Sequence, residues 1–180
     1  MSTSPVILLL SGSLRAASTN EAVLRTAHAL APSAGVEAVH YAGLARLPHF
    51  NPDDDTDPLP APVAELRAAI DRAAGILICT PEYAGSLPGS FKNLLDWTVG
   101  GTEVNDKPVA WINAATQGRG HGAEAALRTV LDYTGAQVVD RACARLPLDR
   151  SMIASDGLLS DPAARHRLGE SLGLLAAAGA

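Results

Sequence analysis

The stretch LLLSGSLRAASTNEAVL, residues 8–24, joins an apolar run to a helical pattern through a short segment rich in hydroxyl groups. The apolar run, residues 6–11 (VILLLS), is continuous and begins with β-branched residues, which is typical of a strand buried on both faces. Residues 20–31 repeat apolar side chains at helical spacing. The order strand, loop, helix therefore predicts a loop over residues 11–20 at the carboxyl end of a buried strand.

The same alternation continues to the end of the chain. Further strands are predicted over 36–42, 75–80, 107–115 and 136–146, and further helices over 62–74, 89–99, 122–136 and 161–178. Strands that alternate with helices indicate a parallel sheet covered by helices on both faces. A chain of 180 residues has the length of one domain, so residues 1–180 are expected to form a single unit. The Pro- and Asp-rich residues 46–62 are predicted to be a surface excursion.

Composition excludes several classes of protein. Hydrophobic residues make up 47% of the chain and charged residues 18%, which predicts a compact globule and not a disordered chain. The net charge is −5 and no dense Lys/Arg stripe occurs, so no nucleic-acid partner is expected. No apolar run reaches the roughly 18 residues of a membrane span. Since the N-terminus also lacks a basic signal region, the expected location is cytoplasmic.

The cysteines and the acidic residues give weak signals. Cys79 and Cys143 lie in apolar segments without a CxxC partner or a nearby His, so we interpret them as buried small hydrophobes, with a redox role as the alternative. The aspartates at 53, 54, 55 and 57 lack the glycine and the closing Glu of a calcium loop. They favour a solvated acidic loop, and no metal site is predicted.

The loop over residues 11–20 has the chemistry of an anion site. A helix N-terminus presents unpaired N–H groups, the loop adds hydroxyls, and Arg15 adds a permanent positive charge. The loop is neither a GxxxxGK[ST] nor a GxGxxG motif, and one glycine among many hydroxyls favours a terminal phosphate. The alternative is a merely capped turn, since Ser18 and Glu21 form an S-x-x-E capping box.

The stretch CTPEYAGSLPGSFKNLLDW, residues 79–97, follows the third predicted strand. Pro81 ends the strand, and glycines and a further proline then give a loop rich in accessible backbone groups. Such groups, with Tyr83, would recognise a flat heteroaromatic ligand. An ordinary half-buried tyrosine is the alternative for Tyr83, and a helix-end or interface carboxylate is the alternative for Glu82.

Together, SGSLRAASTN and PEYAGSLPGSFKNLLDW resemble the two motifs of the NADPH-dependent FMN reductase family. That family's patterns are approximately G-S-L-R-x-x-S-x-N and P-E-Y-N-x-x-x-P-x-x-[LF]-K-N-x-x-D-W, and the resemblance covers residues 6 to about 145. It implies an α/β, flavodoxin-like three-layer sandwich with a five-stranded parallel sheet of order 2-1-3-4-5. It also implies bound FMN, NADPH or NADH as co-substrate, and a small electron acceptor such as a quinone, flavin, chromate or azo compound.

The resemblance assigns residues to the cofactor, and no side chain to catalysis, because the chemistry takes place on the flavin. It implies that the FMN phosphate is held by Ser13, Arg15, Ser18 and Asn20, with Ser11 and Thr19 close by. It implies that the ring and the ribityl chain are lined by Pro81, Glu82, Tyr83, Gly85 and Ser86, with Thr116, Gln117 and Gly118 beside the ring. Ala84 stands where the family usually has Asn, which predicts the loss of one polar contact.

Other expectations keep alternatives open. Arg119 is either a contact for the 2′-phosphate of NADPH or a solvated cation, and His121 is interpreted as a surface residue over a proton donor. The helix Phe91–Trp97 is predicted to be the contact of a homodimer or homotetramer, with core packing of Trp97 as the alternative. The rival functions are a flavodoxin-like electron carrier without nicotinamide chemistry and a binding module without a cofactor.

Overall fold

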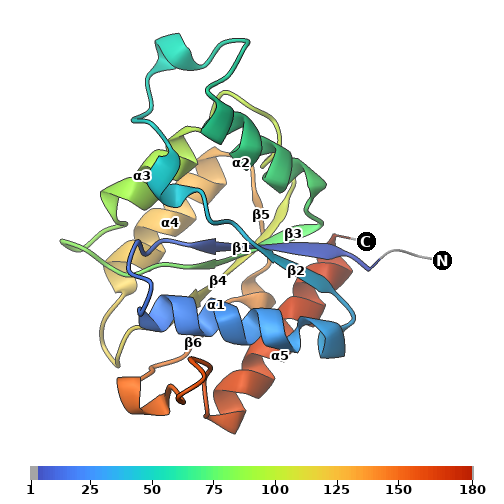
Figure 1. Ribbon diagram of the computed structural model, residues 1–180, viewed down its shortest axis with the longest axis vertical. Helices are drawn as coiled ribbons and strands as arrows, with labels where there is room; N and C mark the ends of the chain where they lie inside the picture. Colours follow the sequence, from blue (N-terminus) through green and yellow to red (C-terminus); the bar gives the residue numbers. More distant parts are fainter. Residues whose placement is uncertain (1–3, 180) are drawn as a thin grey trace.

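The computed structural model describes residues 4–179, and its centre is a parallel sheet (Figure 1). The strands are β1 (Val6–Ser11), β2 (Glu37–His40), β3 (Gly75–Cys79), β4 (Pro108–Asn113) and β5 (Gln137–Val138). Their order is β2-β1-β3-β4-β5, with every pair parallel. The predicted flavodoxin-like order is therefore confirmed.

Helices cover both faces of the sheet and divide the core into two. They are α1 (Thr19–Leu30), α2 (Ala61–Arg72), α3 (Gly89–Asp96), α4 (His121–Tyr133) and α5 (Pro162–Ala178). Ile7 and Leu9 of β1 pack in the cluster of α1 and α5, whereas Leu8 and Leu10 pack in the cluster of α2, α3 and α4. All four side chains are at most 2% exposed, which explains why the strand reads as an unbroken apolar run.

The prediction of one continuous fifth strand over 136–146 is wrong. Within this segment, only the two-residue strands β5 and β6 (Ala144–Arg145) pair with β4, and a 3₁₀ turn over Asp140–Ala142 separates them. The turn directs Asp140 to an ion pair with Arg128 on α4. Charged residues in the middle of the segment thus leave the sheet, and the edge is short and broken, as sheet edges commonly are.

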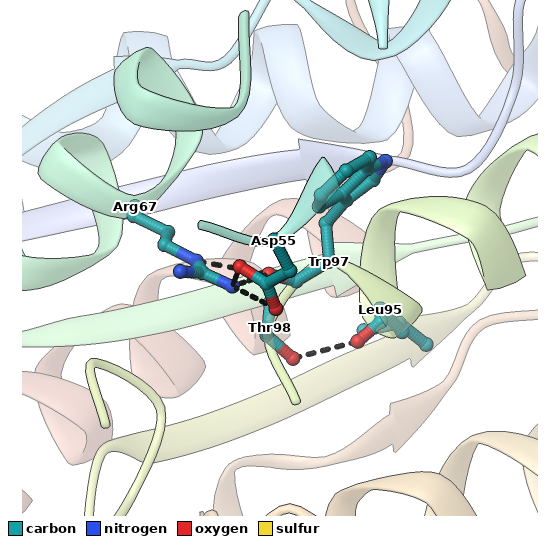
Figure 2. A network of polar contacts seen from close by, with 5 residues as sticks. All are labelled: Asp55, Arg67, Leu95, Trp97 and Thr98. Carbon is teal, nitrogen blue, oxygen red and sulfur yellow. Dashed lines mark hydrogen bonds and ion pairs between the residues drawn. The ribbon is translucent and has the colours of Figure 1, made fainter. Parts of the chain in front are cut away.

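The excursion over residues 46–62 lies on the surface as predicted, at the top of Figure 1. Asp55 departs from the expected solvated loop, since its side chain is only 10% exposed and pairs with Arg67 at 2.8 Å. Figure 2 shows the Arg67 guanidinium between this carboxylate and the carbonyl of Trp97.

Within residues 4–179, no group of three or more His, Cys, Asp or Glu side chains is placed to hold a metal ion.

Helix α3 holds the same excursion from the other side. Trp97 is completely buried, packs edge-to-face on Phe50 at 5.0 Å between ring centroids, and donates from Nε1 to the Pro48 carbonyl at 2.9 Å. Asn93 accepts from the Phe50 amide at 2.8 Å. Core packing, the alternative given for Trp97, is what the structure shows.

None of the helices described is both long and apolar enough to cross a membrane.

Candidate functional site

The two loops singled out by the sequence leave the sheet side by side. Ser11 at the end of β1 is the register partner of Cys79 at the end of β3, and the Gly12 amide donates to the Cys79 carbonyl at 2.9 Å. A Cβ atom on Gly12 would lie 2.0 Å from Thr80 Oγ1. Glycine is required there because the two chains approach so closely.

The loop over residues 11–18 is held by its own hydroxyl groups. Ser11 Oγ accepts from the Ser13 amide at 3.3 Å, and Ser13 Oγ accepts from the Arg15 amide at 3.2 Å. Ser18 is the N-cap of α1, and its Oγ accepts from the Glu21 amide at 3.1 Å. The cap is therefore formed, but the Ser18 amide donates to the Arg15 carbonyl, so the reciprocal half of the capping box is absent from the described contacts.

A cavity of about 370 Å³ opens where the two loops meet. Helix α1 begins here, and the amides of its first two residues have no intrahelical acceptor. The lining contains hydroxyls, arginines and one aromatic ring, and no carboxylate of the described chain. The lining residues are Ser13, Arg15, Ala17, Ser18, Thr19, Asn20, Pro81, Tyr83 and Arg150. This combination fits a phosphate beside a flat group, because the lining brings donors and positive charge together with the ring of Tyr83.

Asn20 connects the start of α1 to β3. Its side chain is nearly buried, and Oδ1 accepts from the Cys79 thiol at 3.3 Å. Burial raises the pKa of the Cys79 thiol far above its usual range, so the thiol stays protonated and remains a donor. Burial also raises the pKa of the half-buried Cys143 thiol, to about 11. Cys79 is thus placed as the interpretation of a small buried residue requires, whereas Cys143 is only partly buried.

The second loop contains a two-residue hairpin turn. The amides and carbonyls of Tyr83 and Ser86 bond reciprocally, at 3.0 Å in each direction. Ala84 and Gly85 between them have φ values of +50° and +74°, the pattern of a type I′ turn, which favours Asn-Gly. Ala84 is therefore strained by its backbone conformation, since an alanine in the left-handed region costs about 1 to 2 kcal/mol. The departure from the family pattern falls at the position where Asn suits the turn.

Two substitutions at this position separate a backbone effect from a side-chain contact. We expect Ala84→Gly and Ala84→Asn both to relieve strain and raise the midpoint of thermal unfolding. We expect only Ala84→Asn to tighten FMN binding, by about two- to tenfold, because one added hydrogen bond contributes about 0.5 to 1.5 kcal/mol. Fluorescence titration of both variants measures this. Equal FMN affinities would show that an amide at residue 84 makes no contact with the cofactor.

Glu82 joins the second loop to α4. Its Oε2 accepts from the Gly122 amide at 2.6 Å and from the Ala123 amide at 3.0 Å. This carboxylate caps a helix whose own N-cap residue, Gly120, has no side chain to do so. The Glu82 side chain is therefore a helix-end carboxylate, which was the alternative interpretation. The prediction that residue 82 lines the flavin then applies to its backbone atoms.

The predicted residues of the third loop lie apart from the cavity. Thr116, Gln117 and Gly118 are exposed and do not line it, and Arg119 and His121 are also exposed. Buried Asn113 holds this loop by accepting from the Ala115 amide at 3.0 Å and donating to Glu124 at 3.1 Å. Burial raises the pKa of Glu124, but hydrogen bonds from Arg145 and Asn113 outweigh it and hold that pKa below its usual value.

Arg150 lines the cavity and was not predicted. Its Nη2 donates to the Ala17 carbonyl at 3.4 Å, across 133 residues of sequence. The residues around it carry no motif, and it reaches the cavity only because the chain after β6 returns to α1. No local sequence pattern signals such a long-range contact.

Comparisons with known proteins agree with this geometry. The model of the family described as NADPH-dependent FMN reductase matches residues 5–148. A quinone reductase of Escherichia coli K12 is 34% identical over 142 residues, which cover 75% of this chain and 73% of the relative. A 2-hydroxy-1,4-benzoquinone reductase of a Burkholderia species is 32% identical over 155 residues, covering 84% and 83%.

The fold comparison gives the same result. The flavoenzyme FerB of Paracoccus denitrificans, an NAD(P)H:acceptor oxidoreductase, superposes with a TM-score of 0.83 at 27% identity and covers 96% of both chains. The family match extends over both loops of the cavity, from β1 to the segment after β6. Sequence motifs, strand order and the cavity at the strand ends lead to one conclusion: the chain belongs to the NADPH-dependent FMN reductase family.

Proposed function

We propose that FMN binds in the 370 Å³ cavity, with its phosphate at Ser13, Arg15, Ser18, Thr19 and Asn20 and its ring along the loop Pro81–Ser86. As a member of its family, the protein is an FMN-dependent NAD(P)H oxidoreductase. One observation carries the placement. The cavity lies where the loops of β1 and β3 meet, is rich in donors and cations, and has no carboxylate among its described lining residues.

The residues of the chain bind and orient the cofactor, and none of them is proposed to donate or accept a proton. Arg15 and the first amides of α1 stabilise the phosphate, while the hydroxyls of Ser11, Ser13 and Ser18 hold the loop in shape. When bound, FMN would supply the redox chemistry that links the nicotinamide to the acceptor. Backbone amides of the loop Pro81–Ser86 are our candidates for stabilising negative charge on the reduced ring.

A quinone or a free flavin is the acceptor we favour. Relatives named quinone reductase and 2-hydroxy-1,4-benzoquinone reductase support the first, and one named NAD(P)H-dependent FMN reductase, from Pseudomonas aeruginosa, supports the second. The test is anaerobic bleaching of the flavin band by NADPH and by NADH, followed by steady-state oxidation of each with quinone, FMN, chromate and azo dye. A protein that binds FMN but oxidises neither nicotinamide would be an electron carrier, and one that binds no FMN would contradict the proposal.

Variants of the first loop test where the phosphate binds. We expect Arg15→Ala combined with Ser18→Ala to weaken FMN binding at least about 100-fold, since charge-assisted hydrogen bonds contribute about 1.5 to 3 kcal/mol each. Ser18→Asp keeps an N-cap and places a negative charge in the cavity, so we expect unchanged thermal stability with weakened FMN binding. Exposed Arg72→Ala is the control. Unchanged FMN affinity in the double variant would exclude this phosphate site.

The proposal also includes a cytoplasmic location and a homodimer or homotetramer that uses α3. Phe91 and Trp97 are completely buried, so the outer side of α3 offers Lys92 and Asp96, which form an ion pair at 2.5 Å. Exposed Val99 lies just beyond the helix. Sedimentation at micromolar concentration, with Val99→Glu as the variant, tests this contact.

A further inference from the structure

The segment over residues 149–160 is a compact excursion that packs against α1. Ile153 and Leu159 form an isolated antiparallel bridge, and the Leu159 amide donates to Thr26 Oγ1 at 2.9 Å in a buried contact. Leu159 is only 1% exposed. These contacts fix the excursion, drawn in orange in Figure 1, beside α1, and they bring Arg150 to the start of that helix.

Arg150 has no acidic partner there. Within residues 4–179, neither Arg15 nor Arg150 has a carboxylate within 4.0 Å, whereas Arg46, Arg67 and Arg145 each have one. The neighbouring Asp149 carboxylate is used by the backbone, because its Oδ1 accepts from the Ser151 amide at 2.8 Å. That hydrogen bond also lowers the pKa of Asp149.

Two arginines therefore line one cavity whose described lining has no compensating negative charge. A phosphate monoester carries about −1.5 to −2 charges at neutral pH. Arg15 supplies one positive charge and the start of α1 contributes about half of one, which leaves up to about half a negative charge of the phosphate without a partner. A guanidinium also offers a planar pair of donors that matches two phosphate oxygens.

We propose that Arg150 is a second phosphate-binding arginine, and that the FMN phosphate thereby fastens the 149–160 excursion to the loop of α1. This inference rests on the proposed binding of FMN in this cavity. The weak 3.4 Å contact of Arg150 with the Ala17 carbonyl holds the guanidinium near the loop, and the donors not used in that contact are available for an anion. Phosphate binding then joins parts of the chain that are more than 130 residues apart in sequence.

Comparing FMN with riboflavin tests the inference, because the two differ by the phosphate alone. We expect Arg150→Met to weaken FMN binding about 10- to 100-fold and to change riboflavin binding less than about twofold. Arg150→Lys should recover part of the loss, and raised salt should weaken FMN binding less in Arg150→Met than in the wild type. Arg72→Met, on the exposed end of α2, is the matched control.

Hydrogen exchange of the excursion gives a readout independent of affinity. In the wild type, saturating FMN should slow exchange of amides in residues 151–158, and saturating riboflavin should not. In Arg150→Met that protection should disappear even with the cofactor saturating. Equal losses of FMN and riboflavin affinity, or full protection in the variant, would overturn the inference.

The outcomes also separate this inference from the proposed function. Wild-type protein that binds no FMN would contradict both. If the wild type binds FMN and Arg15→Ala weakens it while Arg150→Met leaves it unchanged, the function stands and only the role of Arg150 fails.

Discussion

Replacing Arg67 by methionine is expected to lower the free energy of unfolding by about 3 to 5 kcal/mol, because it leaves a buried carboxylate without its partner. Arg67 donates from Nη2 to both oxygens of Asp55, at 2.8 and 3.0 Å, and from Nε and Nη2 to the Trp97 carbonyl, at 3.0 and 2.8 Å (Figure 2). Both charged side chains are only 10% exposed. Urea denaturation followed by circular dichroism measures the change.

Two further variants show whether burial is the cause. Arg46 and Glu65 pair at 2.7 Å with more than half of each side chain exposed, so Arg46→Met should cost less than about 1 kcal/mol. Asp55→Leu combined with Arg67→Met removes both buried charges and should recover part of the stability. If the single and the double variant were equally unstable, lost packing and not the unpaired charge would be the reason.

Gly122→Ala is expected to weaken FMN binding strongly. A Cβ atom there would lie 2.1 Å from the Gly85 carbonyl oxygen and 3.0 Å from Glu82 Oε2, so the loop Pro81–Ser86 must move away from α4. We expect FMN binding to weaken at least about 100-fold, and stability to fall by about 1 to 3 kcal/mol, the usual cost of overpacking. Flavin fluorescence titration and thermal unfolding measure the two effects.

Gly169→Ala is the matched control for this substitution. Gly169 lies inside α5, and a Cβ there meets no atom within 4 Å. Alanine should stabilise the helix by about 0.5 to 1 kcal/mol and leave FMN binding unchanged. If Gly122→Ala bound FMN as tightly as Gly169→Ala, the loop Pro81–Ser86 would not form the ring site.

The sequence predicted the strands whose residues are buried on both faces, because a strand between two apolar layers needs an apolar side chain at every position. It failed at the fifth strand, where Asp140 and Arg141 interrupt the run and the chain turns out of the sheet. It singled out the loop over residues 11–20, which lines the cavity, because the hydroxyl and guanidinium donors there lie close together in sequence. It missed Arg150 because that contact depends on the path of the chain after β6.

Glu82 and Ala84 show a second limit of the sequence. Neighbouring residues do not reveal that a carboxylate caps a helix forty positions later, because the need for this acceptor arises from Gly120, the N-cap residue of α4, which has no side chain. The strain at Ala84 follows from the reciprocal bonds of Tyr83 and Ser86, which set the turn type. Both features depend on how segments meet in three dimensions.

The pairing of Ser11 with Cys79 has a consequence for the energetics of ligand capture. Both loops of the cavity start from one register pair of the sheet, and the hydrogen bond from the Gly12 amide to the Cys79 carbonyl continues that pairing by one residue. The spacing between the proposed phosphate-binding loop and the proposed ring-binding loop is thus set when the sheet forms. The conformational entropy of ordering these loops is lost during folding, so a ligand that arrives later keeps more of its contact energy as affinity.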